Sequence, residues 1–150
     1  MWKIKYNCII TENNNKMNNN NIYKVHNKVI YSIQYHFIFC TKYRRNVLSE
    51  PISTRAKEII QDISTELNSQ IKSMEIMPDH IHILVDLPYK ISPHKFIKLV
   101  KGRTSNLLRK EFNELVTRLP CLWTKSYFVC SVGNVLADNI KKYIEDQWKK

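Results

Sequence analysis

The segment from His80 to Leu87 carries an aliphatic side chain at every odd position and both of its histidines at even positions, and this alternation restricts the fold more than any other feature of the sequence. The odd positions carry only aliphatic side chains, namely Ile81, Ile83, Val85 and Leu87. The even positions carry His80, His82, Leu84 and Asp86. Because successive side chains of a β-strand point to opposite faces, one face of this strand is entirely aliphatic and must be covered. The pattern predicts a sheet with helices packed on one face and both histidines on the other.

The elements around this strand follow the order β-α-β-β-α-β-α. We expect strands at residues 29–40, 71–76, 80–87 and 125–133, and helices at residues 51–68, 93–113 and 135–148. The strands are rich in β-branched and aromatic residues, whereas the helices repeat apolar residues every three or four positions. This order is the ferredoxin-like split βαβ arrangement. The predicted fold class is therefore α+β, with a four-stranded antiparallel sheet, helices on one face and an extra C-terminal helix carrying Tyr143.

Composition and charge narrow the class of partner. The chain has 150 residues, enough for one domain, and 43% of them are hydrophobic. Lysine and arginine outnumber aspartate and glutamate by 24 to 13, which gives a formal charge of +11 and favours nucleic acid first and an anionic membrane surface second. No stretch approaches the roughly 18 apolar residues of a membrane span, and the N-terminus does not resemble a secretory signal. The four cysteines form no CxxC pair, so we expect a reduced, cytoplasmic protein.

Residues 1–27 differ from the rest of the chain. They contain the tract ENNNKMNNNN, which has no apolar periodicity and cannot contribute to a core. We expect a flexible Asn/Lys-rich arm over residues 1–27 and one folded domain over residues 28–150. An unselected extension explains the arm better than a dedicated DNA-binding segment, so we assign it no function.

Two pairs of residues have spacings that suit a metal-dependent site. His80 and His82 emerge from one face of a strand with Cα atoms ~6.5–7 Å apart, so two neutral imidazoles could converge on one divalent cation. A pair of solvated strand histidines explains the spacing equally well. Tyr143 and Gln147 stand four residues apart on the C-terminal helix and share one face. An ordinary packed aromatic explains Tyr143 as well, but a glutamine on the apolar stripe requires a hydrogen-bond or metal partner.

The turn after the first strand carries a compact group of cations with one aromatic residue. The group consists of Lys42, Tyr43, Arg44 and Arg45. It suits phosphate contact plus base stacking, although a solvated charged turn has the same composition. His36 lies on the more polar face of the first strand, and we expect it to pack beside the histidines. Asp79 immediately precedes His80, and turn formation after Pro78 explains it as well as a role beside the metal.

Beyond residue 28, nearly the whole chain resembles the HUH-superfamily single-tyrosine transposases of the TnpA type, which belong to insertion sequences that move as single-stranded DNA. The matching segments, in order, are YSIQYHFIFCTKYRRNVL, MPDHIHILVDLP, FIKLVKGRTSNLLRKEF, LWTKSYFVCSVG and IKKYIEDQ. The His-hydrophobic-His motif alone is weakly specific, but its order with the other segments is highly specific. The resemblance implies that Tyr143 is the catalytic nucleophile. It implies that His80, His82 and Gln147 are the ligands of Mg²⁺ or Mn²⁺. It also implies that the helix carrying Lys101 and Arg103 binds DNA.

The family reaction is cleavage and rejoining of single-stranded DNA through a 5′-phosphotyrosine intermediate, by a homodimer and without ATP. From the resemblance we expect this transposase activity, with hairpin-ended single-stranded DNA as the partner, no membrane association and a nucleoid location when DNA is bound. The nearest alternative is a domesticated endonuclease that acts on genomic hairpin repeats. A further alternative is a non-catalytic single-strand-binding module, since ferredoxin-like sheets often bind single strands through surface aromatics. Histidines on the sheet face argue for catalysis, whereas exposed aromatics there would argue for stacking.

Overall fold

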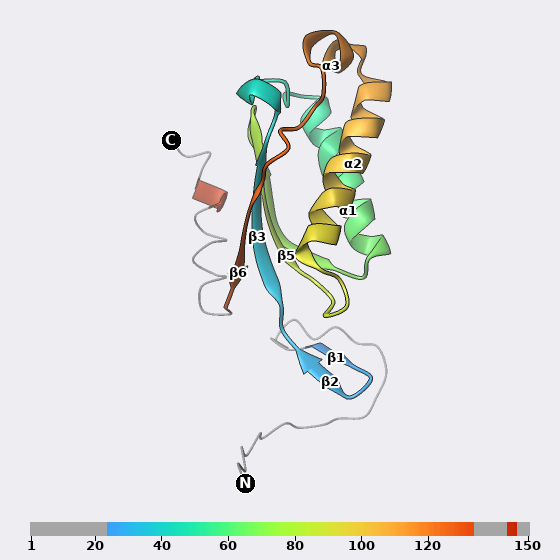
Figure 1. The fold of residues 1–150 in the computed structure, drawn as a ribbon, viewed down its shortest axis with the longest axis vertical. Helices are drawn as coiled ribbons and strands as arrows, with labels where there is room; N and C mark the ends of the chain where they lie inside the picture. Colours follow the sequence, from blue (N-terminus) through green and yellow to red (C-terminus); the bar gives the residue numbers. More distant parts are fainter. Residues whose placement is uncertain (1–23, 134–143, 147–150) are drawn as a thin grey trace.

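The core of the protein is a four-stranded antiparallel sheet with two long helices on one face (Figure 1). The structure, a computed structural model, describes residues 24–133 and 144–146. The sheet contains β3 (Gln34–Cys40), β4 (Gln70–Ile76), β5 (His80–Asp86) and β6 (Phe128–Val132), in the order β4-β5-β3-β6. The covering helices are α1 (Ile52–Glu66) and α2 (Pro93–Glu111). This order is that of a ferredoxin-like split βαβ unit, so the predicted α+β class is confirmed.

The aliphatic face of β5 lies at the centre of the core. The buried cluster contains Ile81, Ile83, Val85 and Leu87 from this segment, and none of the four is exposed. The helices add apolar stripes to the same cluster, including Ile59, Ile60 and Ile63 from α1 and Phe96, Ile97 and Val100 from α2. The aliphatic half of the alternating pattern therefore faces the helices, as predicted, and the histidine half faces away from them.

The second helix starts where the sequence predicted and ends slightly earlier. Pro93 occupies the first helical position, where no backbone N–H is needed. The hydroxyl of Ser92 caps the helix by accepting a hydrogen bond from the backbone N–H of Lys95 at 3.2 Å. The helix ends at Glu111, and a separate short helix, α3 (Asn113–Arg118), follows it.

The predicted first strand is divided in two. Strand β2 (Val29–Tyr31) pairs with β1 (Lys24–His26) in a small separate hairpin, and the sheet strand β3 begins only at Gln34. Strand β1 thus lies within residues 1–27, the segment expected to be an arm. An ion pair of 3.3 Å between Lys24 Nζ and Asp86 Oδ1 links the hairpin to the end of β5.

Residues 144–146 lie on the face of the sheet that is opposite α1 and α2. Of the predicted helix at residues 135–148, the structure describes Ile144, Glu145 and Asp146, so Tyr143 and Gln147 lie outside the described residues. Ile144 is fully buried and packs with Leu84 and Val132 on the face opposite α1 and α2. Within residues 24–133 and 144–146, no helix is long and apolar enough to cross a bilayer.

Replacing Ile83 by alanine should lower the free energy of unfolding by about 2–5 kcal/mol, because this side chain is fully buried between sheet and helices. Ile30→Ala is the matched control. Ile30 is also a strand isoleucine, but it is 52% exposed on β2, so its loss should cost about 0.5 kcal/mol or less. Urea unfolding followed by circular dichroism measures both. Equal losses would contradict the assigned core.

Candidate functional site

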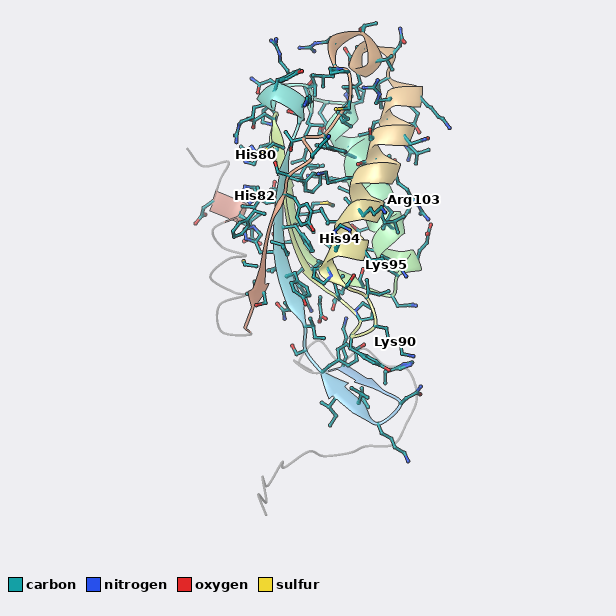
Figure 2. The ribbon with its side chains drawn as sticks, in the orientation of Figure 1. His80, His82, Lys90, His94, Lys95 and Arg103 are labelled. Atoms are coloured by element: carbon teal, nitrogen blue, oxygen red, sulfur yellow. The ribbon has the colours of Figure 1, made fainter. Side chains whose placement is uncertain are left out.

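His80 and His82 lie side by side on the face of β5 that is turned away from the helices (Figure 2). Their ring centroids are 5.0 Å apart and the rings are nearly perpendicular. His82 is almost completely buried, whereas the side chain of His80 is partly exposed. The β-strand alternation thus brings the two imidazoles together at one place on the sheet, which we call the histidine pair.

A third imidazole, from the neighbouring strand β3, packs against His82. Nε2 of His36 and Nδ1 of His82 are 3.2 Å apart, and the two rings stack with centroids 5.4 Å apart. Burial lowers the pKa of His36. Burial, together with the nearby His80 and His36, lowers the pKa of His82 to about 4. His82 is therefore neutral at neutral pH, which is the form of imidazole that donates a lone pair to a metal.

His80 is oriented by the carboxylate that precedes it. Nδ1 of His80 and Oδ1 of Asp79 are 2.5 Å apart. Burial raises the pKa of the Asp79 carboxyl, but the hydrogen bond with His80 and the charge of Arg44 outweigh burial and hold that pKa below its usual range. With a carboxylate on Nδ1, the ring presents Nε2 as the nitrogen that can bind a cation.

The donor set fits a divalent cation. Both members of the histidine pair have Nδ1 in contact with a protein group, an arrangement typical of metal-binding histidines. Among residues 24–133 and 144–146, no group of three His, Cys, Asp or Glu side chains forms a ready-made metal site. Any further ligands would come from elsewhere in the chain or from a bound molecule. Gln147, outside the described residues, stays a prediction in that role.

The cationic turn, which we define as Lys42, Tyr43, Arg44 and Arg45, lies next to His80. It includes the single-turn helix η1 (Lys42–Arg44) at the end of β3. Backbone hydrogen bonds fix its place: the N–H of Thr41 donates to the carbonyl of Asp79 at 2.9 Å. Tyr43 is 67% exposed, and Nζ of Lys42 lies 4.9 Å from the centroid of its ring. The structure therefore brings the predicted cationic turn and the histidine pair together.

Lys101 and Arg103 both belong to α2, which lies in the helix layer on the other side of the sheet from the histidine pair (Figure 1). Nζ of Lys101 donates to three consecutive backbone carbonyls at 2.7–3.2 Å, and burial lowers the pKa of this ammonium group. Arg103 Nη1 forms an ion pair of 2.6 Å with Glu66. Both charges have partners within the fold, and a DNA-binding role for either residue stays a prediction.

Two residues of the histidine face were not singled out in the sequence. Phe128 on β6 is 53% exposed, and its ring lies 6.3 Å from that of His36. Glu75 on β4 pairs with His82 across the sheet, so it emerges on the same face. Phe128 resembles an ordinary apolar strand residue in the sequence, and it lies on β6, an edge strand of the sheet. In the sequence, Glu75 stands between the apolar residues Met74 and Ile76, and this alternation indicates that it points to the opposite face of the strand.

The chain matches the sequence pattern of a transposase family over most of its length. The family is described as "Transposase IS200 like", and the match covers residues 29–147. The ISDra2 transposase TnpA of Deinococcus radiodurans is 32% identical over 123 residues, which are 81% of this chain and 88% of that protein. The transposase for insertion sequence element IS200 of Salmonella typhimurium is 30% identical over 119 residues, 78% of each chain.

Solved structures show the same fold. A putative transposase from Deinococcus radiodurans R1 superposes with a TM-score of 0.68 at 31% identity, covering 83% of this chain and 97% of that one. A REP-associated tyrosine transposase bound to a REP hairpin has a TM-score of 0.60, covering 76% of this chain and 65% of that one. Its identity is 15%, so this second likeness concerns the fold alone. The family match and the relatives at 30% identity or more identify the chain, which belongs to the IS200-like transposase family.

Proposed function

We propose that this transposase cleaves and rejoins single-stranded DNA at the ends of its insertion sequence through a 5′-phosphotyrosine intermediate. The observation that carries the proposal is the histidine pair, which lies on the same sheet face as Ile144. Tyr143 is the residue that precedes Ile144 in the sequence. A buried residue adjacent to the proposed nucleophile thus packs on the face that holds the proposed metal ligands.

The proposed reaction exchanges one phosphodiester for another. The phenol oxygen of Tyr143 forms a bond to the scissile phosphorus while the bond from phosphorus to the 3′ oxygen breaks. The phenol loses its proton and the departing 3′ oxygen gains one, which leaves a 5′-phosphotyrosine and a free 3′-hydroxyl. Attack by another 3′-hydroxyl reverses the step and rejoins the strands. The number of phosphoester bonds is unchanged, so no ATP is required.

The histidine pair supports a divalent cation in this proposal. Mg²⁺ or Mn²⁺ held by His80 and His82, with Gln147 as a further ligand, would polarise the scissile phosphate. The protein's own contribution is orientation: Asp79 and His36 hold the two rings, and burial keeps His82 neutral. His82 is thus ready to act as a ligand at neutral pH.

DNA would reach the site along the cationic turn. Lys42 and Arg45 supply positive charge on the turn that adjoins His80, and Tyr43 offers an exposed ring to an unpaired base. Phe128 offers a second exposed ring on the histidine face itself. A hairpin-shaped DNA end is supported by the REP-associated tyrosine transposase of similar fold, which was solved with a REP hairpin.

Tyr143→Phe should abolish formation of the covalent protein–DNA adduct and lower cleavage by about 10³-fold or more, because it removes only the attacking oxygen. Binding of hairpin DNA should remain close to that of the wild type. The measurement uses labelled single-stranded DNA from the flanks of the protein's own gene, with Mg²⁺ or EDTA, on a denaturing protein gel.

Tyr127→Phe and Tyr31→Phe are the controls. Tyr127 contacts His94 in the helix layer, and Tyr31 belongs to the small hairpin, so both variants should still form the adduct. Adduct formation by Tyr143→Phe would identify Tyr143 as a packed aromatic. Loss of the adduct in Tyr127→Phe alone would mean that the wrong tyrosine has been named.

His80→Ala and His82→Ala should each abolish cleavage while hairpin binding is largely retained, because most of the affinity for DNA comes from the basic surface. His94→Ala is the matched control, since His94 lies on α2 in the other layer and should leave cleavage unchanged. Gel-shift and cleavage assays on the same substrate separate the two effects. Equal losses of binding and cleavage in the histidine-pair variants would argue against a metal site and for a simple binding module.

We expect the full chain to be a homodimer, as the family resemblance implies. Sedimentation equilibrium at micromolar concentration should give twice the chain mass of 17.9 kDa without DNA, and two chains plus the bound DNA when hairpin DNA is added. A species with one chain under both conditions would exclude a site shared between subunits, but it would not affect the proposed chemistry within one chain.

A further inference from the structure

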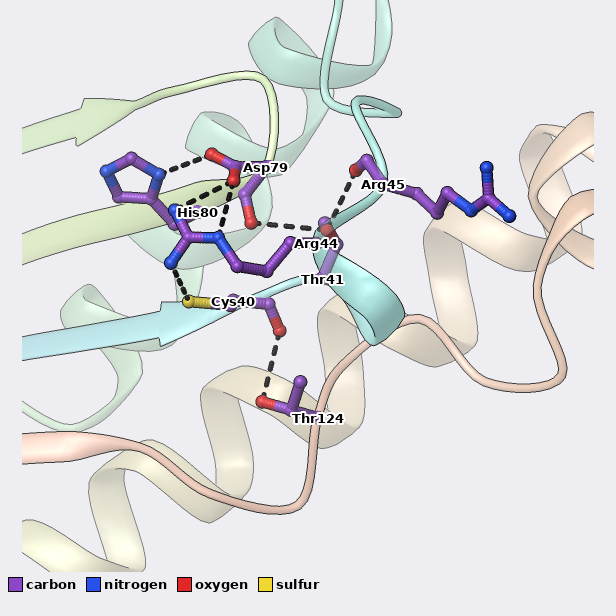
Figure 3. A network of polar contacts seen from close by, with 7 residues as sticks. All are labelled: Cys40, Thr41, Arg44, Arg45, Asp79, His80 and Thr124. Carbon is purple, nitrogen blue, oxygen red and sulfur yellow. Dashed lines mark hydrogen bonds and ion pairs between the residues drawn. The ribbon is translucent and has the colours of Figure 1, made fainter.

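Asp79 connects the cationic turn to the histidine pair through both of its carboxylate oxygens (Figure 3). Oδ2 accepts a hydrogen bond from Nε of Arg44 at 2.9 Å and forms an ion pair with Nη2 at 2.8 Å, while Oδ1 contacts Nδ1 of His80. The remaining guanidinium nitrogen, Nη1, donates to Sγ of Cys40 at 3.6 Å. All three nitrogens of the Arg44 guanidinium are therefore directed at protein atoms.

The backbone of the cationic turn is shaped around this contact. Tyr43 and Arg44 have φ angles of 58° and 50°, in the left-handed region that non-glycine residues rarely adopt. Thr41 fixes the turn from both sides, since its N–H donates to the carbonyl of Asp79 at 2.9 Å and its hydroxyl donates to the carbonyl of Arg45 at 2.8 Å. Backbone of this kind persists only where the surroundings determine it, and it concentrates at functional sites.

We propose that Arg44 and Asp79 are a positioning pair that ties the DNA-binding turn to the metal ligand: Arg44 fixes the carboxylate of Asp79, and Asp79 fixes the His80 ring with Nδ1 protonated and Nε2 turned to the cation. The inference rests on the proposed function for the role of His80. It gives Arg44 a different task from its neighbours in the turn. Lys42 and Arg45 contact DNA, whereas Arg44 acts through Asp79 on the geometry of the site.

The chemistry of the guanidinium group suits this task. Nε and Nη2 approach the same carboxylate oxygen from a planar group, so they restrict the rotation of the Asp79 side chain. A lysine at position 44 would supply charge without that planar pair of donors. The side chain of Arg44 is more than half exposed, so its ion pair adds little to global stability. The effect of removing it should therefore appear at the metal site and not in the unfolding curve.

The test measures Mn²⁺ binding by electron paramagnetic resonance on the full, DNA-free chain. Asp79→Ala should weaken Mn²⁺ binding by about 10- to 100-fold, as loss of a carboxylate behind a metal-binding histidine does. Arg44→Ala should weaken it less, on the order of three- to tenfold, because Arg44 acts through Asp79. Arg45→Ala is the matched control: it removes an identical charge from the next residue, and it should weaken DNA binding while leaving the Mn²⁺ affinity unchanged.

A second readout is the tautomer of His80, followed by ¹⁵N NMR of the ring nitrogens in the metal-free protein. The wild type should show a protonated Nδ1, and Asp79→Ala should show the other tautomer or a mixture. Asp79→Asn separates the two contacts, because its amide oxygen can still accept from His80 while its amide nitrogen cannot accept from Arg44. This variant should keep the wild-type tautomer and reproduce the Mn²⁺ affinity of Arg44→Ala, and it serves if Asp79→Ala does not fold.

Two results would overturn the inference. One is a wild-type Mn²⁺ affinity together with an unchanged His80 tautomer in Asp79→Ala or, if only Asp79→Asn folds, a wild-type Mn²⁺ affinity in that variant. The other is an equal effect of Arg44→Ala and Arg45→Ala on Mn²⁺ binding. Failure of the proposed function has a different signature, since His80→Ala would then bind Mn²⁺ as tightly as the wild type does.

Discussion

The pairing register of the central strand β5 determines both the core and the candidate site. β5 is hydrogen-bonded on both sides, to β3 and to β4, and its aliphatic face is completely buried. A slip of one residue would turn His80 and His82 into the core beneath the helices and expose Ile81 and Ile83. The same register sets His82 opposite Ile38 and Leu84 opposite His36, so His36 and His82 are diagonal neighbours whose rings meet. Packing of the aliphatic face is therefore what holds the imidazoles in position.

Periodicity in the sequence was enough to predict the layers but not the contacts between distant side chains. Alternation within residues 80–87 predicted which face holds the histidines, and the order of elements predicted the sheet. The contact between Arg44 and Asp79 joins residues 35 positions apart, and no periodic signal specifies such a meeting. The expectation of one continuous strand over residues 29–40 was wrong because Val29–Tyr31 pairs with Lys24–His26 instead of with the sheet. The Asn-rich tract that precedes this short strand has no apolar periodicity, so the strand was not predicted.

Fewer cations are available to contact DNA than the formal charge of +11 suggests. Arg55 and Arg103 form ion pairs with glutamates, Lys24 pairs with the buried Asp86, and Lys101 is bound to three carbonyls. These cations hold elements of the fold together: Arg55, for example, joins α1 to Glu111 at the end of α2. Composition counts all of them equally, which is why it indicates a polyanionic partner and does not locate the binding surface. The contacts direct attention to the cationic turn.

Negative and positive side chains lie at different places around the histidine pair. The rings of His36 and His82 are kept neutral by burial, and a carboxylate, Asp79, contacts His80 from the end of the strand. Neutral donors beside a carboxylate favour a cation, whereas Lys42 and Arg45 on the adjacent turn favour a phosphate backbone. In the proposed function, a strand that lies along the turn would present a phosphate beside the neutral ring of His82. Arg44 belongs to the turn by sequence, but its ion pair with Asp79 places its charge at the boundary between these two regions.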